Sequence, residues 1–313
     1  MDSTFVPVRS HHYDPELTFD FCVNEPAWNN QAGIHSAFGS TDRLYFRKEV
    51  PVNHNNDLSS SYSTTVWRGE RANAQILVWS SEALEQVRVS TQDLRSAEGN
   101  IIPKDRITFE LVRYVLSNYP YAEKKAICGE SPYKSGFLMP DRFETLDRFD
   151  LPSQTTRPVW MMVDVPRGTV PGTYKGQVEV RAKGKAPQLL NLEIVVQNQL
   201  LPYPKDWKYR LDLWQNPWAV AWDNHVEPWS PEHKMLLKQH LKHYADAGGT
   251  YITTYGVHSP WSDNSYMIEG GMIEWIKKAD GTWAFDYKIF DEYVELAMEC
   301  GIDEAITLYT PIP

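Results

Sequence analysis

Short runs in which hydrophobic and polar residues alternate dominate the chain up to about residue 200. About seven of these runs are rich in β-branched and aromatic residues, which is typical of strands, and no convincing amphipathic helix lies between them. The runs cover residues 42–50, 64–80, 85–92, 107–117, 157–165, 172–182 and 189–197. In the sixth run, Val178 and Val180 alternate with charged or amide side chains, as in an antiparallel strand with one solvated face. The pattern predicts a β-sandwich.

Residues 118–156 interrupt this pattern, because they contain few strand signals. Structureless connections of that length are uncommon in compact domains unless they cover a site or are flexible. The sequence alone leaves the role of this segment open.

The pattern changes at residues 200–207, where two prolines separate the end of a predicted strand from a new arrangement. Such a composition is typical of a rigid domain junction. Beyond it, strands are predicted at 207–214, 250–257 and 304–310, helices at 230–249 and 286–301, and a hairpin at 272–285. Ser230 and Pro231 have the residue types of a helix N-cap and first helical position. We therefore expect two domains, residues 1–202 and 203–313.

The alternation of strands and helices in the second domain predicts the opening of a (β/α)8 barrel. A complete barrel usually needs about 250 residues, so residues 203–313 would hold only its first ~3 βα units. The predicted fold class is mixed β and α/β, an N-terminal β-sandwich followed by an incomplete (β/α)8 TIM barrel. We expect the chain to be truncated.

Charge and composition exclude several kinds of partner. The formal net charge of −10 and pI of about 5.4 oppose binding to nucleic acid or to an anionic membrane surface. No apolar run approaches the length of a membrane span, and the first residues lack the apolar core of a signal peptide, although such a signal could have been removed. Cys22, Cys128 and Cys300 lack paired spacing, so neither a disulfide framework nor a zinc site is predicted.

Five segments, in the family's own order, resemble glycoside hydrolase family 123, a β-N-acetylgalactosaminidase family. They are "WRGERANAQILVWS" (67–80), "RPVWMMVDVPRGTVPGTYKG" (157–176), "LDLWQNPWAVA" (211–221), "PWSPEH" (228–233) and "DGTWAFDYKIFDEYVELAMECGI" (280–302). The resemblance extends over nearly the whole chain, and it implies a β-sandwich followed by a catalytic barrel. It also implies a retaining hydrolase in which the 2-acetamido oxygen of β-linked N-acetylgalactosamine attacks the anomeric carbon.

The resemblance further implies a consecutive Asp and Glu at the end of a later barrel strand. The Asp would orient the acetamido group, and the Glu would protonate the departing oxygen. Asp303-Glu304 matches this pair in type but lies between Gly301 and the start of the third predicted strand, whereas barrel enzymes use the carboxyl ends of strands. We therefore expect the catalytic pair to follow Pro313, and we expect the chain alone to be inactive.

Eight of the twelve tryptophans lie between Trp207 and Trp283, several of them in loops after predicted strands. An aromatic platform with nearby amides suits the apolar faces and polar edges of sugars. The predicted substrate-binding residues are Trp214, Gln215, Asn216, Trp218, His258, Trp261 and Tyr309. Alternatively, the indoles pack the two domains together. Pro217 argues against one helix that carries Trp214, Trp218 and Trp222.

No cofactor or metal is expected. His240 and His243 stand three residues apart on a predicted helix, but their lysine neighbours indicate a solvated surface. The charged residues Arg68, Glu70 and Arg71 are interpreted as structural ion pairs with the adjacent domain.

A glycan is the expected partner, and the open edge of the last predicted strand favours self-association. Two alternative functions remain: a carbohydrate-binding protein without catalysis, and a related glycosidase that acts on another sugar. The resemblance favours a secreted or periplasmic location with the signal removed.

Overall fold

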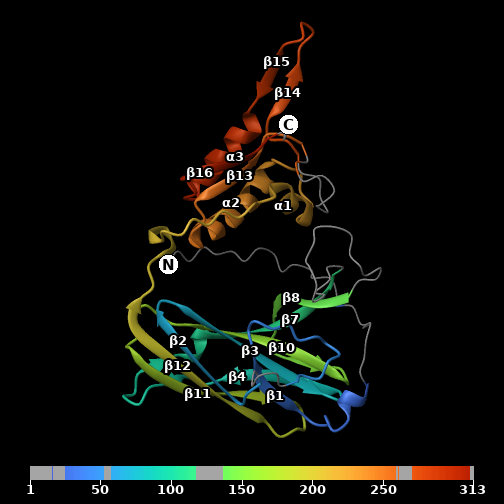
Figure 1. The fold of residues 1–313 in the computed structure, drawn as a ribbon, viewed down its shortest axis with the longest axis vertical. Coiled ribbons are helices and arrows are strands. Elements are labelled where there is room, and N and C mark those ends of the chain that lie inside the picture. The colour runs from blue at the N-terminus through green and yellow to red at the C-terminus, as the bar shows by residue number, and fades with distance from the viewer. Residues whose placement is uncertain are drawn as a thin grey trace. The chain divides into compact units, whose positions relative to one another are not determined.

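The computed structural model describes residues 16, 25–52, 58–117, 137–258, 260 and 270–310. The chain divides into two compact units, Met1–Leu201 and Pro202–Pro313 (Figure 1). Strands make up most of the described residues of the first unit, whereas the described residues of the second unit form three α-helices and two small sheets.

Two sheets form the first unit. Its strands are β1 (His35–Gly39), β2 (Ser61–Arg68), β3 (Arg71–Ser80), β4 (Leu84–Thr91), β5 (Leu94–Arg95), β6 (Ile101–Ile102), β7 (Ile107–Ser117), β8 (Phe137–Thr145), β9 (Phe149–Leu151), β10 (Thr155–Asp164), β11 (Gly172–Arg181) and β12 (Gln188–Leu200). One sheet has the order β1-β3-β10-β7-β8, and the other has the order β2-β12-β11-β4-β9, with β5 pairing with β11 and β6. Each described pair is antiparallel except β2 with β12.

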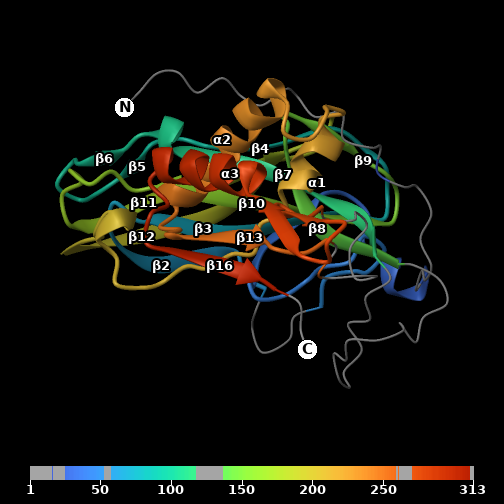
Figure 2. The same cartoon turned by 90° about the horizontal axis from the view of Figure 1, so that it is seen from above.

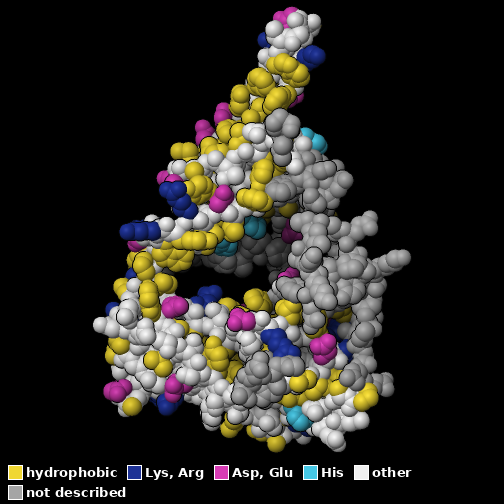
Figure 3. Space-filling model, viewed as in Figure 1, with side chains coloured by type: hydrophobic (Ala, Val, Ile, Leu, Met, Phe, Trp, Pro, Cys, Tyr) yellow, Lys and Arg dark blue, Asp and Glu magenta, His cyan; other side chains and the backbone are white. Residues whose placement is uncertain are grey.

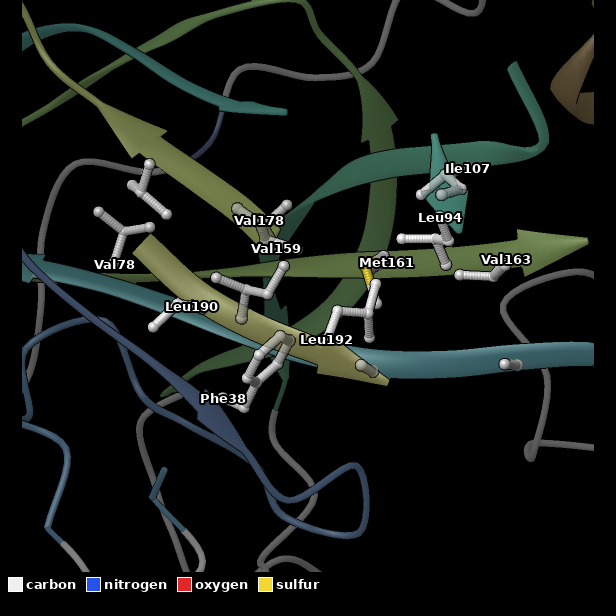
Figure 4. Packing of buried hydrophobic residues seen from close by; sticks show 14 of the residues in the cluster. Phe38, Val78, Leu94, Ile107, Val159, Met161, Val163, Val178, Leu190 and Leu192 are labelled. Carbon is white, nitrogen blue, oxygen red and sulfur yellow. The ribbon is translucent and has the colours of Figure 1, made fainter. Parts of the chain in front are cut away.

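The two sheets share one hydrophobic core. Along β10, Val159, Met161 and Val163 are buried while the intervening side chains are partly exposed, because successive residues of a strand point to opposite faces. Figure 4 shows Val159 from the first sheet close to Val178 from the second, with Met161 and Val163 further along the same strand. The residues that alternate in the sequence therefore build the core between the sheets.

Two segments of the first unit differ from the sequence-based prediction. Residues 42–50 form turns rather than a strand, since Tyr45 is buried and its hydroxyl accepts the Ser40 N–H at 3.0 Å. Conversely, β8 lies inside the segment with few strand signals. Its Pro140 is tolerated because β8 is the edge strand of its sheet, where a missing N–H costs little.

A buried charge cluster anchors Glu16 to the first sheet. Its carboxylate accepts hydrogen bonds from both terminal nitrogens of Arg157 at 2.8 Å, and from the Tyr114 backbone N–H at 3.0 Å. Arg113 and Arg47 lie 3.1 Å and 3.6 Å from the same group. Burial alone would raise the pKa of Glu16, but the hydrogen bond and charge of Arg157, with the other donors, lower it.

The second unit contains α1 (Pro217–Asp223), α2 (Pro231–Asp246), β13 (Tyr251–Tyr255), β14 (Glu274–Lys277), β15 (Trp283–Asp286), α3 (Lys288–Glu299) and β16 (Ala305–Tyr309). Strands β13 and β16 are parallel, and β14 and β15 form an antiparallel hairpin. Helices α2 and α3 pack together with β13 around a second core (Figure 2). The predicted start of α2 is confirmed, because the Ser230 hydroxyl accepts the His233 N–H and Pro231 is the first helical residue.

The predicted (β/α)8 barrel is wrong for this structure. Among the described residues of the second unit, β13 pairs only with β16, β14 pairs only with β15, and neither sheet closes. The predicted first strand, 207–214, contributes a single bridge between Leu211 and Gly249. Side-chain hydrogen bonds take the place of a ladder here: the Tyr244 hydroxyl lies 2.8 Å from the Leu211 oxygen and 3.0 Å from the Tyr251 oxygen.

Candidate functional site

The carboxyl ends of β13 and β16 meet at the same edge of their sheet. Tyr255 and Tyr309 are register partners at this edge, and their ring centroids are 5.6 Å apart. The backbone N–H of Gly256 donates to the Tyr309 oxygen at 2.9 Å, which extends the contact by one residue. Ligands of α/β proteins bind beyond the carboxyl ends of parallel strands. We therefore expect a ligand site at this edge.

The segment that carries Trp214 and Gln215 is fixed against β13. The Gln215 side-chain oxygen accepts the Thr253 N–H at 3.0 Å, and its backbone oxygen accepts the Tyr255 hydroxyl at 2.5 Å. Trp214 stands edge-on to Tyr309, at 5.7 Å and 86° between the rings, yet 62% of its surface is exposed. Three predicted site residues, Trp214, Gln215 and Tyr309, thus lie together at the carboxyl edge.

Asn216 and Trp218 have structural roles. The Asn216 side-chain oxygen accepts the Ala219 N–H at 3.2 Å and caps α1, and Pro217 is the first helical residue. Pro217 therefore begins a helix that carries Trp218, contrary to the expectation that it would oppose one. Trp218 is only 8% exposed, and its ring meets Tyr255 edge-on in the second core.

His258, three residues after the end of β13, lines a pocket that Trp214 does not line. The cavity has a volume of about 490 Å³ and is lined by Val257, His258, Gly271, Ile273, Glu274, Trp275 and Ile289. The Trp275 indole N–H donates to the Gly256 oxygen at 2.9 Å, so the pocket wall is attached to the residue that follows β13. Trp261 lies outside the described residues.

Sequence reasoning missed two kinds of residue in this unit. Glu274 and Trp275 line the pocket, and their signal in the sequence was only the predicted hairpin at 272–285, which follows His258 along the chain. His233 was also missed, although it occupies the third helical position after a serine cap, where a side chain commonly bonds back to the chain entering the helix.

His233 joins the starts of α1 and α2. It is fully buried, its Nδ1 accepts the Trp229 N–H at 2.8 Å, and its Nε2 donates to the Pro217 oxygen at 2.9 Å. Burial lowers its pKa, against a smaller opposing effect of the Pro217 hydrogen bond. A neutral His233 therefore fixes the loop between the two helices, directly after the Trp214 segment.

Asp303 and Glu304 stand at the opposite, amino end of β16. The Glu304 backbone N–H donates to the Thr250 oxygen at 3.1 Å, and its carboxylate lies 3.5 Å from Arg210. At the carboxyl half of the sheet, the Thr307 hydroxyl donates to Asp212 at 2.9 Å. Burial, together with the charge of Asp212, raises the pKa of Tyr309.

No group of three His, Cys, Asp or Glu side chains in the described part of the chain could hold a metal ion. Nor is any helix in the same part long and apolar enough to cross a membrane. Arg68, Glu70 and Arg71, which were expected to pair with the adjacent domain, have partners within the first unit. Arg71 binds Asp164, its partner on the next strand, at 2.6 Å, Arg68 donates to the Asn198 oxygen at 2.9 Å, and Glu70 accepts the Trp67 N–H at 2.6 Å.

The chain resembles a solved structure over most of its length. That structure is a family 123 glycoside hydrolase from Clostridium perfringens, described for glycolipid glycan hydrolysis, with 23% identity and a TM-score of 0.76. The match covers 89% of this chain and 48% of the enzyme, so the chain spans about half the length of that relative. A match to a PapD-like domain of human CEP192 covers 60% of this chain and 99% of that domain at 12% identity, but the TM-score of 0.27 is too low to indicate a common fold. No curated protein matches.

Two family models match the sequence in succession. Residues 38–182 match the glycoside hydrolase 123 N-terminal domain, and residues 214–313 match the glycoside hydrolase 123 catalytic domain. The second match begins at Trp214 and contains the described carboxyl edge of β13 and β16. The chain belongs to glycoside hydrolase family 123.

Proposed function

We propose that this chain supplies a sugar-binding part of a retaining hydrolase that acts on β-linked N-acetylgalactosamine with the help of the substrate's 2-acetamido group. The observation that carries the proposal is the exposed indole of Trp214, held against Tyr309 beside Gln215 at the carboxyl ends of two parallel strands. The family supports the hydrolase class, and the arrangement supports a pyranose ring as the ligand.

The geometry suits a sugar because its apolar and polar parts are placed before the ligand arrives. A pyranose has an apolar face of C–H groups, which an indole surface can cover, and a rim of hydroxyls, which amides and phenols can bind. Gln215 is fixed by the hydrogen bonds to Thr253 and Tyr255, and Trp214 is its chain neighbour. Holding these groups in place reduces the entropy lost on binding.

The proposed chemistry uses the substrate as its own nucleophile. The acetamido oxygen bonds to the anomeric carbon, the bond to the departing oxygen breaks, and an acid gives that oxygen a proton. Water then attacks the anomeric carbon and gives a proton back to the group that acted as the acid. The bond to the acetamido oxygen breaks, and the configuration is retained. In this proposal, the exposed Trp214 contacts the ring, whereas Gln215 and Tyr309, whose amide nitrogen and hydroxyl are buried, hold Trp214 in place. Proton transfer is not assigned to Asp303 or Glu304, which lie at the amino end of β16.

The experiment compares a chemically graded set of ligands. Calorimetry on this chain would measure binding of the methyl β-glycosides of N-acetylgalactosamine, N-acetylglucosamine and galactose. We expect N-acetylgalactosamine to bind tightest and galactose to bind weakly, because a site that uses the acetamido group must hold it. Trp214→Ala should weaken binding, whereas Trp67→Ala in the first unit, also partly exposed, should leave it unchanged.

Hydrolysis needs a second measurement. Nitrophenol release from the aryl β-N-acetylgalactosaminide would be followed with this chain and with the full product of its gene. Replacing the acetamido group by trifluoroacetamido should slow the reaction strongly, because the fluorines withdraw electron density and make the attacking oxygen less nucleophilic. An unchanged rate would remove substrate assistance from the proposal, and tighter binding of another sugar would change the substrate. Binding without turnover by the full gene product would favour a carbohydrate-binding protein.

A further inference from the structure

The hairpin of β14 and β15 exposes a row of aromatic side chains. Trp275, Trp283, Phe285 and Tyr287 are each between 44% and 50% exposed, and Figure 3 shows hydrophobic side chains gathered along this hairpin. A two-stranded hairpin is marginally stable in water, and exposed apolar patches of this kind mark binding surfaces. We therefore infer that this row of aromatic side chains is a binding surface.

The strand register puts the aromatic residues on one face. Trp275 is the partner of Phe285, and Lys277 is the partner of Trp283. The side chains of Trp275, Lys277, Trp283 and Phe285 therefore share one side of the hairpin. Neighbouring rings are in contact: Trp275 is 5.2 Å from Phe285 and 6.3 Å from Trp283. Tyr287 continues the row, 6.4 Å from Phe285.

The base of this row opens into the pocket of about 490 Å³, a size in the range that small-molecule ligands occupy. Its walls are mostly apolar, and they carry two polar side chains, His258 and Glu274. Within the described residues, neither of these two makes a hydrogen bond or an ion pair. An aromatic wall with free donor and acceptor groups fits the apolar face and hydroxyl rim of a sugar better than it fits a purely apolar partner.

We propose that the pocket and the aromatic row form a second carbohydrate subsite, which binds a sugar ring next to the ring held at Trp214. The ligand would then be a linear oligosaccharide rather than a single sugar. This inference rests on the proposed function, since it extends the same edge. Trp275 binds the Gly256 oxygen, and the Gly256 N–H binds Tyr309, so one residue links the two subsites.

Trp275 is the central residue of the second subsite. Its indole N–H is already bonded to the Gly256 oxygen, and Phe285 meets its ring edge-on at 87°. These contacts fix the ring before a ligand binds, which lowers the entropy cost of stacking a sugar on it. Trp222 provides a matched control, because it is exposed on α1 and does not line the pocket.

The test uses calorimetry on the 313-residue chain with two probes. One is methyl β-N-acetylgalactosaminide, and the other is a linear β-linked trisaccharide that ends in N-acetylgalactosamine. We expect the trisaccharide to bind at least about tenfold tighter, which is the usual effect of one anchoring aromatic contact. Trp275→Ala should abolish this difference and leave the affinity for the methyl glycoside unchanged. Trp222→Ala should preserve the difference.

A second variant tests the subsite without removing Trp275, because the hairpin could fail to fold in Trp275→Ala. The double substitution His258→Ala and Glu274→Ala keeps the aromatic row and should still reduce trisaccharide affinity several-fold. Equal affinity for the two probes, no trisaccharide binding, or trisaccharide binding unaffected in both variants would overturn the second subsite. Trisaccharide binding that depends on Trp275, without any binding of the methyl glycoside, would support the subsite and reject the proposed function.

Discussion

The hydroxyl of Tyr255 lies 2.5 Å from the backbone oxygen of Gln215, and this bond fixes the Trp214 segment to β13 where no strand ladder exists. Tyr255→Phe would leave the Gln215 oxygen unpaired, at a cost of about 1–3 kcal/mol if water cannot reach it. We expect faster amide hydrogen exchange at Thr253, whose N–H bonds the Gln215 side chain. Tyr209→Phe, at a highly exposed position, is the control. Unchanged exchange at Thr253 would show that the bond does not hold the segment.

Replacing Trp214 by alanine should mainly affect sugar binding, whereas replacing Trp218 by alanine should mainly affect stability. Trp218→Ala removes a buried core ring and should cost about 3–5 kcal/mol of stability in the second unit. Trp214→Ala removes an exposed ring, so it should change stability by only about 0.5 kcal/mol while sugar binding falls. Urea unfolding and calorimetry measure the two effects. Loss of stability in Trp214→Ala without loss of binding would give Trp214 a packing role instead.

His233 predicts a pH dependence of the second unit. Burial lowers its pKa in the folded chain below the ordinary value of 6.5, so the unfolded chain binds the proton more readily. Its contribution to stability is therefore fully present above about pH 6.5 and is lost as the pH falls from there towards the lower folded pKa. Protonation would also turn Nδ1 into a donor that faces the Trp229 N–H.

Unfolding free energies at two pH values, above and below 6.5, measure this effect. In His233→Asn the second unit should be less stable at the higher pH, and its stability should change less between the two values. His225→Asn is the control, because His225 is exposed and has a φ of 54°, a conformation that asparagine tolerates. An identical pH dependence in wild type and His233→Asn would refute the assignment.

Glu16 predicts a large stability effect in the first unit. Glu16→Gln would leave the buried guanidinium groups of Arg157 and Arg47 with less counter-charge, which commonly costs about 3–5 kcal/mol. Because the pKa of Glu16 is lowered from 4.5, its contribution is present above that value and is lost as the pH falls through the lower folded pKa. Urea unfolding checks both effects. Glu85→Gln, whose ion pair with Lys183 is exposed and screened by water, should leave stability nearly unchanged.

The elements of the second unit could be predicted from sequence more readily than their assembly. Ser230 and Pro231 predicted the start of α2, and Gly281 predicted the hairpin turn, because helix caps and turns depend on residues close together in the sequence. Closure of a barrel depends instead on contacts between residues far apart in the sequence. The alternation of strands and helices could not show that residues 207–215 would be held beside β13 by the hydroxyls of Tyr244 and Tyr255 instead of by a ladder.

The candidate site was partly predictable for the same reason. The exposed Trp214 and the buried Trp218 stand four residues apart in similar sequence surroundings, and only the start of α1 at Pro217 separates their environments. Trp275 and Glu274 reach the pocket through the hairpin fold, far along the chain from His258. Tertiary packing decides such placements, whereas periodicity reports one element at a time.

The most direct test of a sugar site at the carboxyl edge is a titration of the ¹⁵N-labelled chain with methyl β-N-acetylgalactosaminide, followed through the tryptophan indole N–H signals. Each signal would be assigned by single Trp→Phe substitutions. We predict that the Trp214 signal moves in a saturable manner. The signal of Trp79, whose indole bonds Gln31 in the first unit, should stay fixed. A stationary Trp214 signal at saturating sugar, or shifts confined to the first unit, would contradict the account.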